Sequence, residues 1–177
     1  MFVLNITELV LKYNTGVTFD YAFFWGEKYE NGFLSNWYPC EFIVDNVKYW
    51  CTEQYMMAKK AELFGDNEVQ AEIMASKNQK EIKDLGRKVR NFDGVIWDKN
   101  KKSIVFDGNL AKFSQNEKLK SMLLSTGDKI LVEASPYDKI WGIGRSVRDG
   151  VNLKIPTNWL GENLLGFILM EVREKLS

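Results

Sequence analysis

The sequence contains no histidine, and it has only two cysteines and three prolines in 177 residues. The lack of histidine excludes Ser-His-Asp and Cys-His catalytic groups and removes the commonest side-chain general base and metal ligand. Cys40 and Cys51 cannot build a four-cysteine zinc site or a disulfide framework, and so few thiols are typical of a reducing compartment. We expect no metal and no cofactor, since a metal site here would depend on carboxylates alone.

Long apolar runs are also missing. The longest are about four residues, such as 167–170, whereas a membrane-spanning helix needs about 20. Segment 1–16 mixes polar with apolar residues and lacks both a basic start and a small-residue cleavage site, which favours folded structure over a signal peptide. We therefore expect a cytoplasmic protein that does not contact a membrane.

Charge is balanced overall but unevenly distributed. Lysine and arginine together number 24, as do aspartate and glutamate, which argues against a wholly basic nucleic-acid-binding surface. Residues 1–75 carry a net charge of −6, residues 76–120 carry +6, and the remainder is neutral. The basic middle third could face a phosphate-bearing ligand, or it could be the solvated, lysine-rich surface of helices.

The residues that are present predict one globular domain over 1–177, because hydrophobic residues make up 45% of the chain and no repeat or linker is visible. The pattern predicts a strand over 19–25 and a hairpin whose turn is Asp45-Asn46, since both residues tolerate positive φ. A further short strand is expected over 129–133. Helices are expected near 53–64, 67–75, 78–89, 96–113, 116–127 and 162–175. The fold class is therefore α+β, mostly helical with a small antiparallel β element.

The helix expected over 53–64 carries the most informative pattern. Glu53, Met57, Lys60 and Phe64 share one face, and the two apolar members indicate that this face points inward. Glu53 and Lys60 are about 10 Å apart along the axis, so a ligand could lie between them. The spacing also fits a simpler structure, in which a first-turn carboxylate stabilises the helix dipole and the lysine reaches solvent.

Six tryptophans are present, and most should belong to the core. Trp37, Trp97 and Trp141 have loop-like neighbours, where an indole could stack on a flat base. The segment Trp141-Gly142-Ile143-Gly144 lacks the third glycine and the strand–turn–helix setting of a dinucleotide site, so we do not expect one.

Ordered segments of the chain match the motifs of one known family. The matching segments are Phe33-Leu34-Ser35-Asn36-Trp37-Tyr38-Pro39, Glu53-Gln54-Tyr55 with Ala58 and Lys60, Leu85-Gly86-Arg87, Trp97, Ala111-Lys112-Phe113 with Gln115-Asn116, Thr126-Gly127-Asp128, 131–136, Asp138 with Trp141-Gly142 and Gly144, and Trp159 with Gly161, Asn163 and 165–166, leading into 169–173. Taken together, these segments resemble the NADAR family, also called YbiA-like N-glycosidases. The resemblance covers about 150 residues and is strongest over 19–176. Gln54 departs from the family, which often has histidine there, and an amide cannot shuttle a proton near neutral pH.

The resemblance implies a YbiA-like fold and an N-glycoside hydrolase that cleaves a ribosyl C–N bond. The expected substrate is ADP-ribose linked to guanine, in ADP-ribosylated nucleic acid, or a phosphorylated ribosylaminopyrimidine, which is a nucleotide-like small molecule. The expected catalytic residues are Glu53, Lys60, Asp138 and Trp141. Expected substrate-binding residues are Ser35, Asn36, Trp37, Arg87, Trp97, Gly142, Gly144 and Asn163. Arg87 and Arg90, from the basic middle third, are the candidate phosphate contacts.

Two other classes stay open at this point. A non-catalytic module that binds ADP-ribose or a related nucleotide would keep the pocket without turnover. A structural or interaction domain would use the tryptophans only as core. A concave pocket joining segments 33–37, 53–60 and 138–144 would argue against the structural class. Oligomeric state cannot be read from the sequence.

Overall fold

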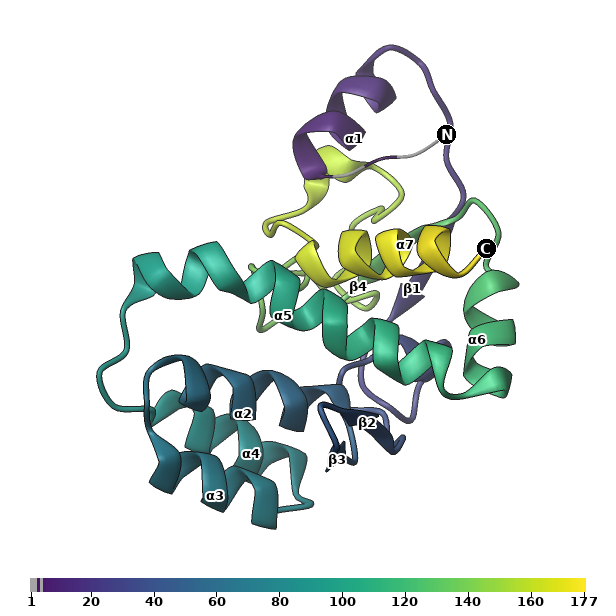
Figure 1. Ribbon diagram of the computed structural model, residues 1–177. Coiled ribbons are helices and arrows are strands. Elements are labelled where there is room, and N and C mark those ends of the chain that lie inside the picture. Colours follow the sequence, from purple (N-terminus) through teal and green to yellow (C-terminus); the bar gives the residue numbers. More distant parts are fainter. Residues whose placement is uncertain (1–2, 4) are drawn as a thin grey trace. The chain divides into compact units, whose positions relative to one another are not determined.

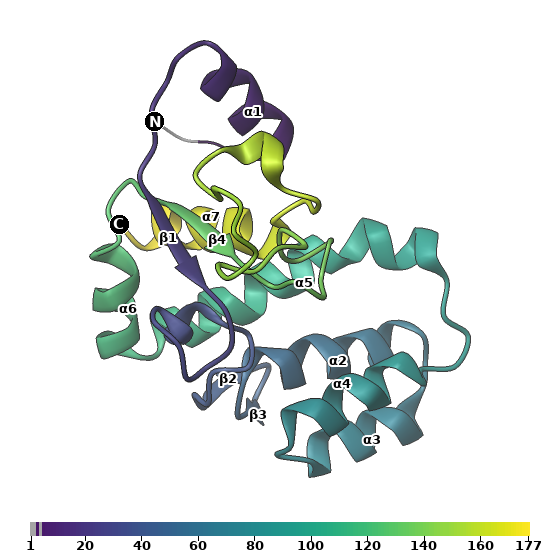
Figure 2. The ribbon, with the colours of Figure 1, turned by 180° about the vertical axis from the view of Figure 1, so that it is seen from behind.

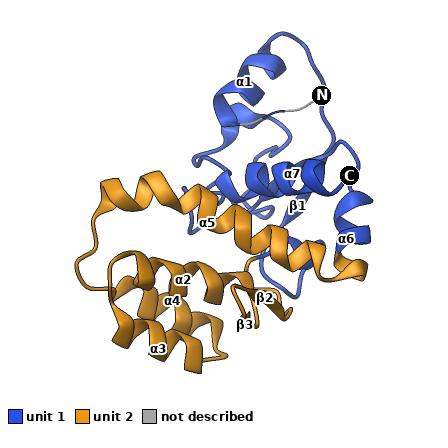
Figure 3. Cartoon of the chain, viewed as in Figure 1, with its two compact units in different colours: residues 1–35, 120–177 blue, residues 36–119 orange. Residues whose placement is uncertain are grey.

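The computed structural model describes residue 3 and residues 5–177. The chain forms two compact units, coloured separately in Figure 3. We call residues 1–35 with 120–177 the terminal unit, and residues 36–119 the central unit. Within the described residues, no helix combines the length and apolar character needed to cross a membrane.

The terminal unit is built on a two-stranded parallel sheet. Strand β1 (Tyr21–Phe24) pairs with β4 (Ile130–Glu133). Helix α7 (Leu164–Leu176) packs on β4, as both ribbon views show (Figures 1 and 2). The remaining elements of this unit are helix α1 (Ile6–Asn14) and short 3-10 helices at Gly32–Leu34 and Pro156–Asn158. The sequence predicts both strands, but not their pairing and not α1.

The central unit is a helical layer with one hairpin. Helix α2 packs against α3, α4 and α5, and the hairpin packs against α2 and α5 (Figure 1). Its elements are β2 (Phe42–Val44), β3 (Val47–Tyr49), α2 (Thr52–Leu63), α3 (Asn67–Ala75), α4 (Gln79–Arg87) and α5 (Gly94–Ser114). Helix α6 (Glu117–Leu124) begins in this unit and ends in the terminal one. The expected fold class, α+β and mostly helical with a small antiparallel element, is confirmed.

The hairpin forms at the expected turn. Asp45 and Asn46 have φ of 51° and 63°, and β2 and β3 pair antiparallel. The outward edge of β2 is occupied by a side chain: the Ile43 N–H donates to Oε1 of Gln115 at 2.9 Å, and Nε2 of Gln115 donates to the Ile43 carbonyl at 2.7 Å. One primary amide thus makes the two bonds that a neighbouring strand residue would make.

Residue preference favours Thr52, Asn67 and Asn78 as the N-caps of α2, α3 and α4, and in the structure the first two caps are displaced by one residue. Helix α4 is capped by Asn78 as the sequence predicts, whose Oδ1 accepts from the Glu81 N–H at 3.0 Å. Helix α2 begins after Cys51 rather than at a Thr52 cap, and α3 begins after Asp66 rather than at an Asn67 cap. Both chosen residues accept a hydrogen bond from a first-turn N–H and are themselves buried, so tertiary contacts select them.

The buried face of α5 also differs from the apolar stripe that its sequence offers at Ile104, Val105, Leu110 and Phe113. Val105 and Phe113 are fully buried as expected, whereas Ile104 and Leu110 line an open hollow of about 600 Å³ beside the hairpin. The other buried positions of this helix are Gly108, Asn109 and Lys112. A glycine and two polar residues thus take places that the pattern assigns to apolar side chains.

Candidate active site

Helix α2 carries the candidate carboxylate in its first turn. Glu53 is only 4% exposed, and its backbone N–H donates to the Asn36 carbonyl at 2.9 Å. This bond ties Asn36, in the 33–39 motif, to the first turn of α2 at the candidate carboxylate. A buried carboxylate at a helix N-terminus is favoured by the aligned peptide dipoles, so the helix supports its charge.

Lys60 lies two turns further along the same helix. Its Nζ donates to the Gly86 carbonyl at 2.7 Å and lies 4.3 Å from the centre of the Phe92 ring and 5.7 Å from that of Trp97. Burial lowers the pKa of the Lys60 amine below its ordinary value. A lysine acts as a nucleophile only through its neutral amine, so a nucleophilic Lys60 would need a shift in this direction.

Glycine at position 86 allows α4 to lie directly on α2. A Cβ placed on Gly86 would overlap Sδ of Met57 and would lie 2.8 Å from its Cγ. The absence of a side chain therefore lets the Gly86 carbonyl reach the Lys60 amine. This gives a physical reason for the glycine of the Leu85-Gly86-Arg87 motif.

The loop that carries Phe92 is anchored by an ion pair. Asp66 is buried and caps α3, and its carboxylate accepts hydrogen bonds from the backbone N–H, Nε and Nη2 of Arg90, at 2.8, 3.1 and 2.5 Å. These bonds hold the pKa of the Asp66 carboxyl well below its usual range. Arg90 therefore has a clear structural role, while Arg87 pairs with Asp84 at 3.0 Å and is mostly exposed.

Gln54, where the family often has histidine, is buried and spans three elements. Its Oε1 accepts from the Trp50 N–H at 3.0 Å, and its Nε2 donates to carbonyls of the α3 C-terminal segment, the closest being Ser76 at 2.9 Å. The amide thus holds the start of α2 against the hairpin and α3. In this chain the position is structural, since every one of these bonds goes to backbone.

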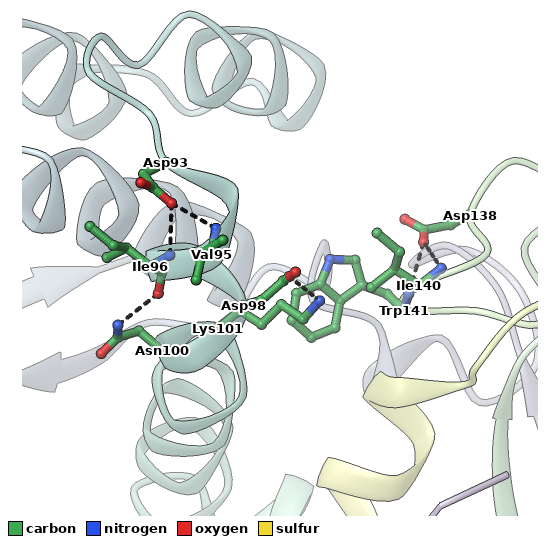
Figure 4. Close-up of polar contacts among 9 residues, drawn as sticks. All are labelled: Asp93, Val95, Ile96, Asp98, Asn100, Lys101, Asp138, Ile140 and Trp141. Atoms are coloured by element: carbon green, nitrogen blue, oxygen red, sulfur yellow. Dashed lines mark hydrogen bonds and ion pairs between the residues drawn. The ribbon is translucent and has the colours of Figure 1, made fainter. Parts of the chain in front are cut away.

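The other central-unit candidates lie around these residues. The Trp37 carbonyl accepts from Nε2 of Gln79 at 3.3 Å, and Lys83 Nζ is 5.8 Å from the Trp37 ring centre. Trp97 lies in the first turn of α5, whose N-terminus is capped by Asp93 (Figure 4). Both indoles are partly exposed, as a stacking surface requires.

In the terminal unit, Asp138 organises the loop of the Trp-Gly-x-Gly segment. Its Oδ1 accepts from the N–H groups of Ile140 and Trp141 at 2.9 and 2.8 Å (Figure 4), and its carbonyl accepts from Gly144 at 2.9 Å. A Cβ on Gly142 would lie 2.8 Å from the Glu133 carbonyl, so this glycine permits a close backbone approach. Gly144 has φ of +62°, which favours glycine.

Two further candidates of this unit are buried and bonded to backbone. Asn163 donates through Nδ2 to the Leu131 carbonyl at 2.8 Å and accepts at Oδ1 from the Glu133 N–H at 2.9 Å, so it extends β4 by one side chain. The Ser35 N–H donates to the Gly32 carbonyl at 2.9 Å. Their binding roles, like those of the other candidates, stay predictions, as does the pocket joining segments of both units.

Two residues near Glu53 and Lys60 are not predicted from the sequence. Phe92 is 48% exposed and directly precedes the cap of α5, a setting that could have marked it. Asn109 is fully buried in a helix interior, and a helical stripe of positions 105, 109, 112 and 113 would have revealed it. Among the described residues, no group of three acidic or cysteine side chains is arranged to hold a metal.

Comparisons with known proteins show the family to which the chain belongs. The model of the NADAR domain matches residues 23–177. The chain is 50% identical over 167 residues to N-glycosidase R617 of Acanthamoeba polyphaga mimivirus, covering 89% of this chain and 97% of that one. It is 32% identical over 154 residues to the riboflavin biosynthesis protein VVA0006 of Vibrio vulnificus, covering 87% of this chain but only 38% of that protein.

Among solved structures, the fold resembles the NMR structure of the Escherichia coli protein YbiA. The TM-score is 0.73 at 26% identity, over 90% of this chain and 86% of that one. Fold and relatives together define an α+β enzyme of the N-glycosidase class, which confirms the expected class. The chain belongs to the NADAR family, as the ordered motifs predict.

Proposed function

We propose that this protein hydrolyses the bond between a ribose anomeric carbon and a base nitrogen, with ADP-ribose on guanine or a phosphorylated ribosylaminopyrimidine as substrate. Water supplies the hydroxyl that bonds to the anomeric carbon. The electron pair of the broken C–N bond goes to the base nitrogen, which takes a proton. The observation that carries the proposal is a buried carboxylate, Glu53, followed two turns later by a desolvated amine, Lys60.

Glu53 is proposed to stabilise the positive charge that develops on the sugar as the bond breaks. The carboxylate is fixed on a helix and excluded from solvent, so its field is stronger than it would be in water. Removal of one preorganised group of this kind typically costs about 3–4 kcal/mol of transition-state stabilisation. The same carboxylate can accept a proton from the attacking water.

Lys60 offers a covalent route to the same products. Its neutral amine attacks the anomeric carbon, the base leaves with a proton, and the ribose ring opens to give an imine between Nζ and C1′. Water then hydrolyses the imine and restores the amine. The lowered pKa of Lys60 raises the fraction of neutral amine near pH 7, which this route requires.

The remaining candidates are proposed to bind the substrate. Trp97 and Trp141 would enclose the base or the sugar, and Asp138 would hold ribose hydroxyls. Arg87, the mostly exposed arginine at the end of α4, would contact phosphate. Ser35, Asn36, Trp37, Gly142, Gly144 and Asn163 are proposed as further substrate-binding residues. The riboflavin-related name of the Vibrio relative supports including the pyrimidine substrate.

A hydrolysis panel tests the proposal. Guanine-linked ADP-ribose and a ribosylaminopyrimidine phosphate are incubated with the protein, and released base is measured by mass spectrometry. Glu53→Gln should abolish release, whereas Glu62→Gln, an exposed glutamate of the same helix, should not. Binding of either compound without release by the wild-type protein would instead identify a non-catalytic module.

Borohydride trapping separates the two routes. If Lys60 is the nucleophile, reduction during turnover should add the sugar mass to the peptide containing Lys60, and Lys60→Met should lose both adduct and turnover. Lys59→Met is the matched control, because the adjacent Lys59 amine pairs with Glu62 at 3.1 Å instead. A Lys60→Met variant with near-normal turnover would leave the water route through Glu53.

A further inference from the structure

The Lys60 amine is enclosed by two aromatic rings and one backbone carbonyl. Its Nζ donates to the Gly86 carbonyl at 2.7 Å, and it lies 4.3 Å from the centre of the Phe92 ring and 5.7 Å from that of Trp97. Among the described residues, no carboxylate forms an ion pair with this amine. Phe92 is the closer of the two rings, and because it is 48% exposed it also separates the amine from solvent.

The charged side chains of the neighbouring elements pair with one another instead. Glu53, on the same helix, lies two turns away from Lys60. The pairs are Lys59 with Glu62 on α2, Asp84 with Lys80 and Arg87 on α4, Arg90 with Asp66 and Glu68 in the loop after α4, and Asp98 with Lys101 on α5. Burial is accordingly the cause of the lowered Lys60 pKa, so the groups that cover this amine control its proton.

The Phe92 ring is fixed in place from both sides of its short loop. Two residues before it, Arg90 donates through its backbone and its side chain to the buried Asp66 carboxylate. Directly after it, Asp93 caps α5 by accepting from two first-turn N–H groups at 2.7 and 3.0 Å. The ring itself packs edge-on against Phe64, with 5.2 Å between ring centres. The loop therefore holds a half-exposed ring in one position, over the Lys60 amine.

We propose that Phe92 is a positioning residue whose ring covers the Lys60 amine, excludes water from it and prepares it to attack the anomeric carbon of the substrate. The attack itself rests on the proposed function. The ring affects the amine in two opposite ways, because the cover disfavours the charged form while the π face attracts it. Since the net effect of the surroundings is a lowered pKa, the cover outweighs the attraction.

Two substitutions separate these effects. Each variant is acetylated with trace acetic anhydride over a pH series, and the midpoint of Lys60 labelling, located by fragment mass spectra, reports the pKa of its amine. Phe92→Ala opens the cover, so the midpoint should rise toward that of an ordinary lysine. Phe92→Leu keeps an apolar cover without a π face, so the midpoint should stay at or below the wild-type value. The adjacent Lys59 amine, paired with Glu62, is the internal reference.

Val95→Ala is the matched control, because Val95 is an exposed apolar residue in the first turn of α5 and should leave the midpoint unchanged. A wild-type midpoint in Phe92→Ala would overturn the inference, whatever the catalytic result. A rise of equal size in Phe92→Leu would also overturn it, since that result would indicate a disturbed loop rather than a missing cover.

The pH profile of base release tests the catalytic part. For Phe92→Ala, kcat/KM should fall severalfold at pH 7, and the loss should shrink as pH rises to 9, because the amine then becomes neutral in both proteins. Phe92→Leu should keep most of the activity. A loss that is the same at both pH values would refute the preparation of Lys60 for attack. A raised labelling midpoint in Phe92→Ala, with no base release by the wild type, would support the cover and reject hydrolysis.

Discussion

Lys112 gives the sharpest quantitative prediction, because this lysine is completely buried. Its Nζ lies 4.9 Å from the Phe113 ring centre and 5.5 Å from that of Tyr38. Desolvation lowers the pKa of Lys112 from its ordinary value near 10.5 to about 7, against a smaller opposing effect of the Cys40 and Cys51 thiols. At pH 7 the folded protein therefore holds a much larger fraction of this amine neutral than the unfolded chain does.

The sign of the resulting pH dependence follows from proton binding. Between pH 7 and 10.5 the unfolded chain binds more protons at Lys112 than the folded protein does, so stability rises with pH in this window. A shift from 10.5 to 7 corresponds to about 4 kcal/mol at pH 7, of which about 2 kcal/mol is regained by pH 9. Lys112→Met lacks this titration, so its stability relative to wild type should fall by that amount as pH increases from 7 to 9.

The assay is urea unfolding at both pH values, followed by tryptophan fluorescence. The free energy of unfolding of wild type is compared with that of Lys112→Met at each pH, so that titration of the buried tyrosines, which is common to both proteins, cancels. Lys102→Met, at an exposed position of the same helix, is the control for loss of a lysine. If the difference in unfolding free energy between wild type and Lys112→Met changes by less than about 0.5 kcal/mol between pH 7 and 9, the amine of Lys112 is not desolvated as argued.

Three further predictions concern residues around the candidate site. Gly86→Ala should lower the free energy of unfolding by about 1–3 kcal/mol, because the added Cβ overlaps Met57. In urea unfolding, the stability losses of Met57→Ala and Gly86→Ala should sum to more than the loss of the double variant. Strict additivity of the two losses would contradict the overlap. Asp66→Asn should have a lower Tm than wild type at pH 7. This difference in Tm should shrink as pH falls through the lowered pKa of the Asp66 carboxyl, because protonation then breaks the ion pair with Arg90 in the wild type. A difference in Tm that does not change at low pH would argue against the ion pair. Alkylation of the native protein at pH 8, followed by mass spectrometry, should show slow labelling of Cys40 and no labelling of Cys51. Cys51 is fully buried, and burial raises the pKa of its thiol to about 12. Equal labelling of the two cysteines would contradict this prediction.

The sequence predicts those parts of the molecule in which local chemistry decides. The Asp45-Asn46 turn, the Asn78 cap and the burial of Glu53 follow from residue type and spacing. The choice of Cys51 over Thr52 as a cap depends instead on which residue the surrounding fold buries. Periodicity cannot decide between Cys51 and Thr52, because the two residues are adjacent and each side chain offers an acceptor atom.

The burial of polar residues in the interior could not be predicted from the sequence pattern. Asn109 and Lys112 occupy buried positions of α5 that a hydrophobic pattern assigns to apolar neighbours. Gln54 also has an unexpected role, because its bonds go to backbone that only the tertiary fold brings near. For Asn109 and Gln54, long-range hydrogen bonding overrides local preference, and the periodicity of one sequence carries no signal for partners about 20 or more residues away.

The Gln115 amide has a consequence for solubility. A two-stranded ribbon normally offers its exposed backbone to any other extended peptide, which is a route to domain exchange and fibre growth. Here the Gln115 side chain already occupies the N–H and C=O of Ile43 at the edge of β2. Without the Gln115 amide, the half-exposed Ile43 would lie beside backbone groups that lack a protein partner, and β2 would become the strand through which copies of this chain aggregate at high concentration.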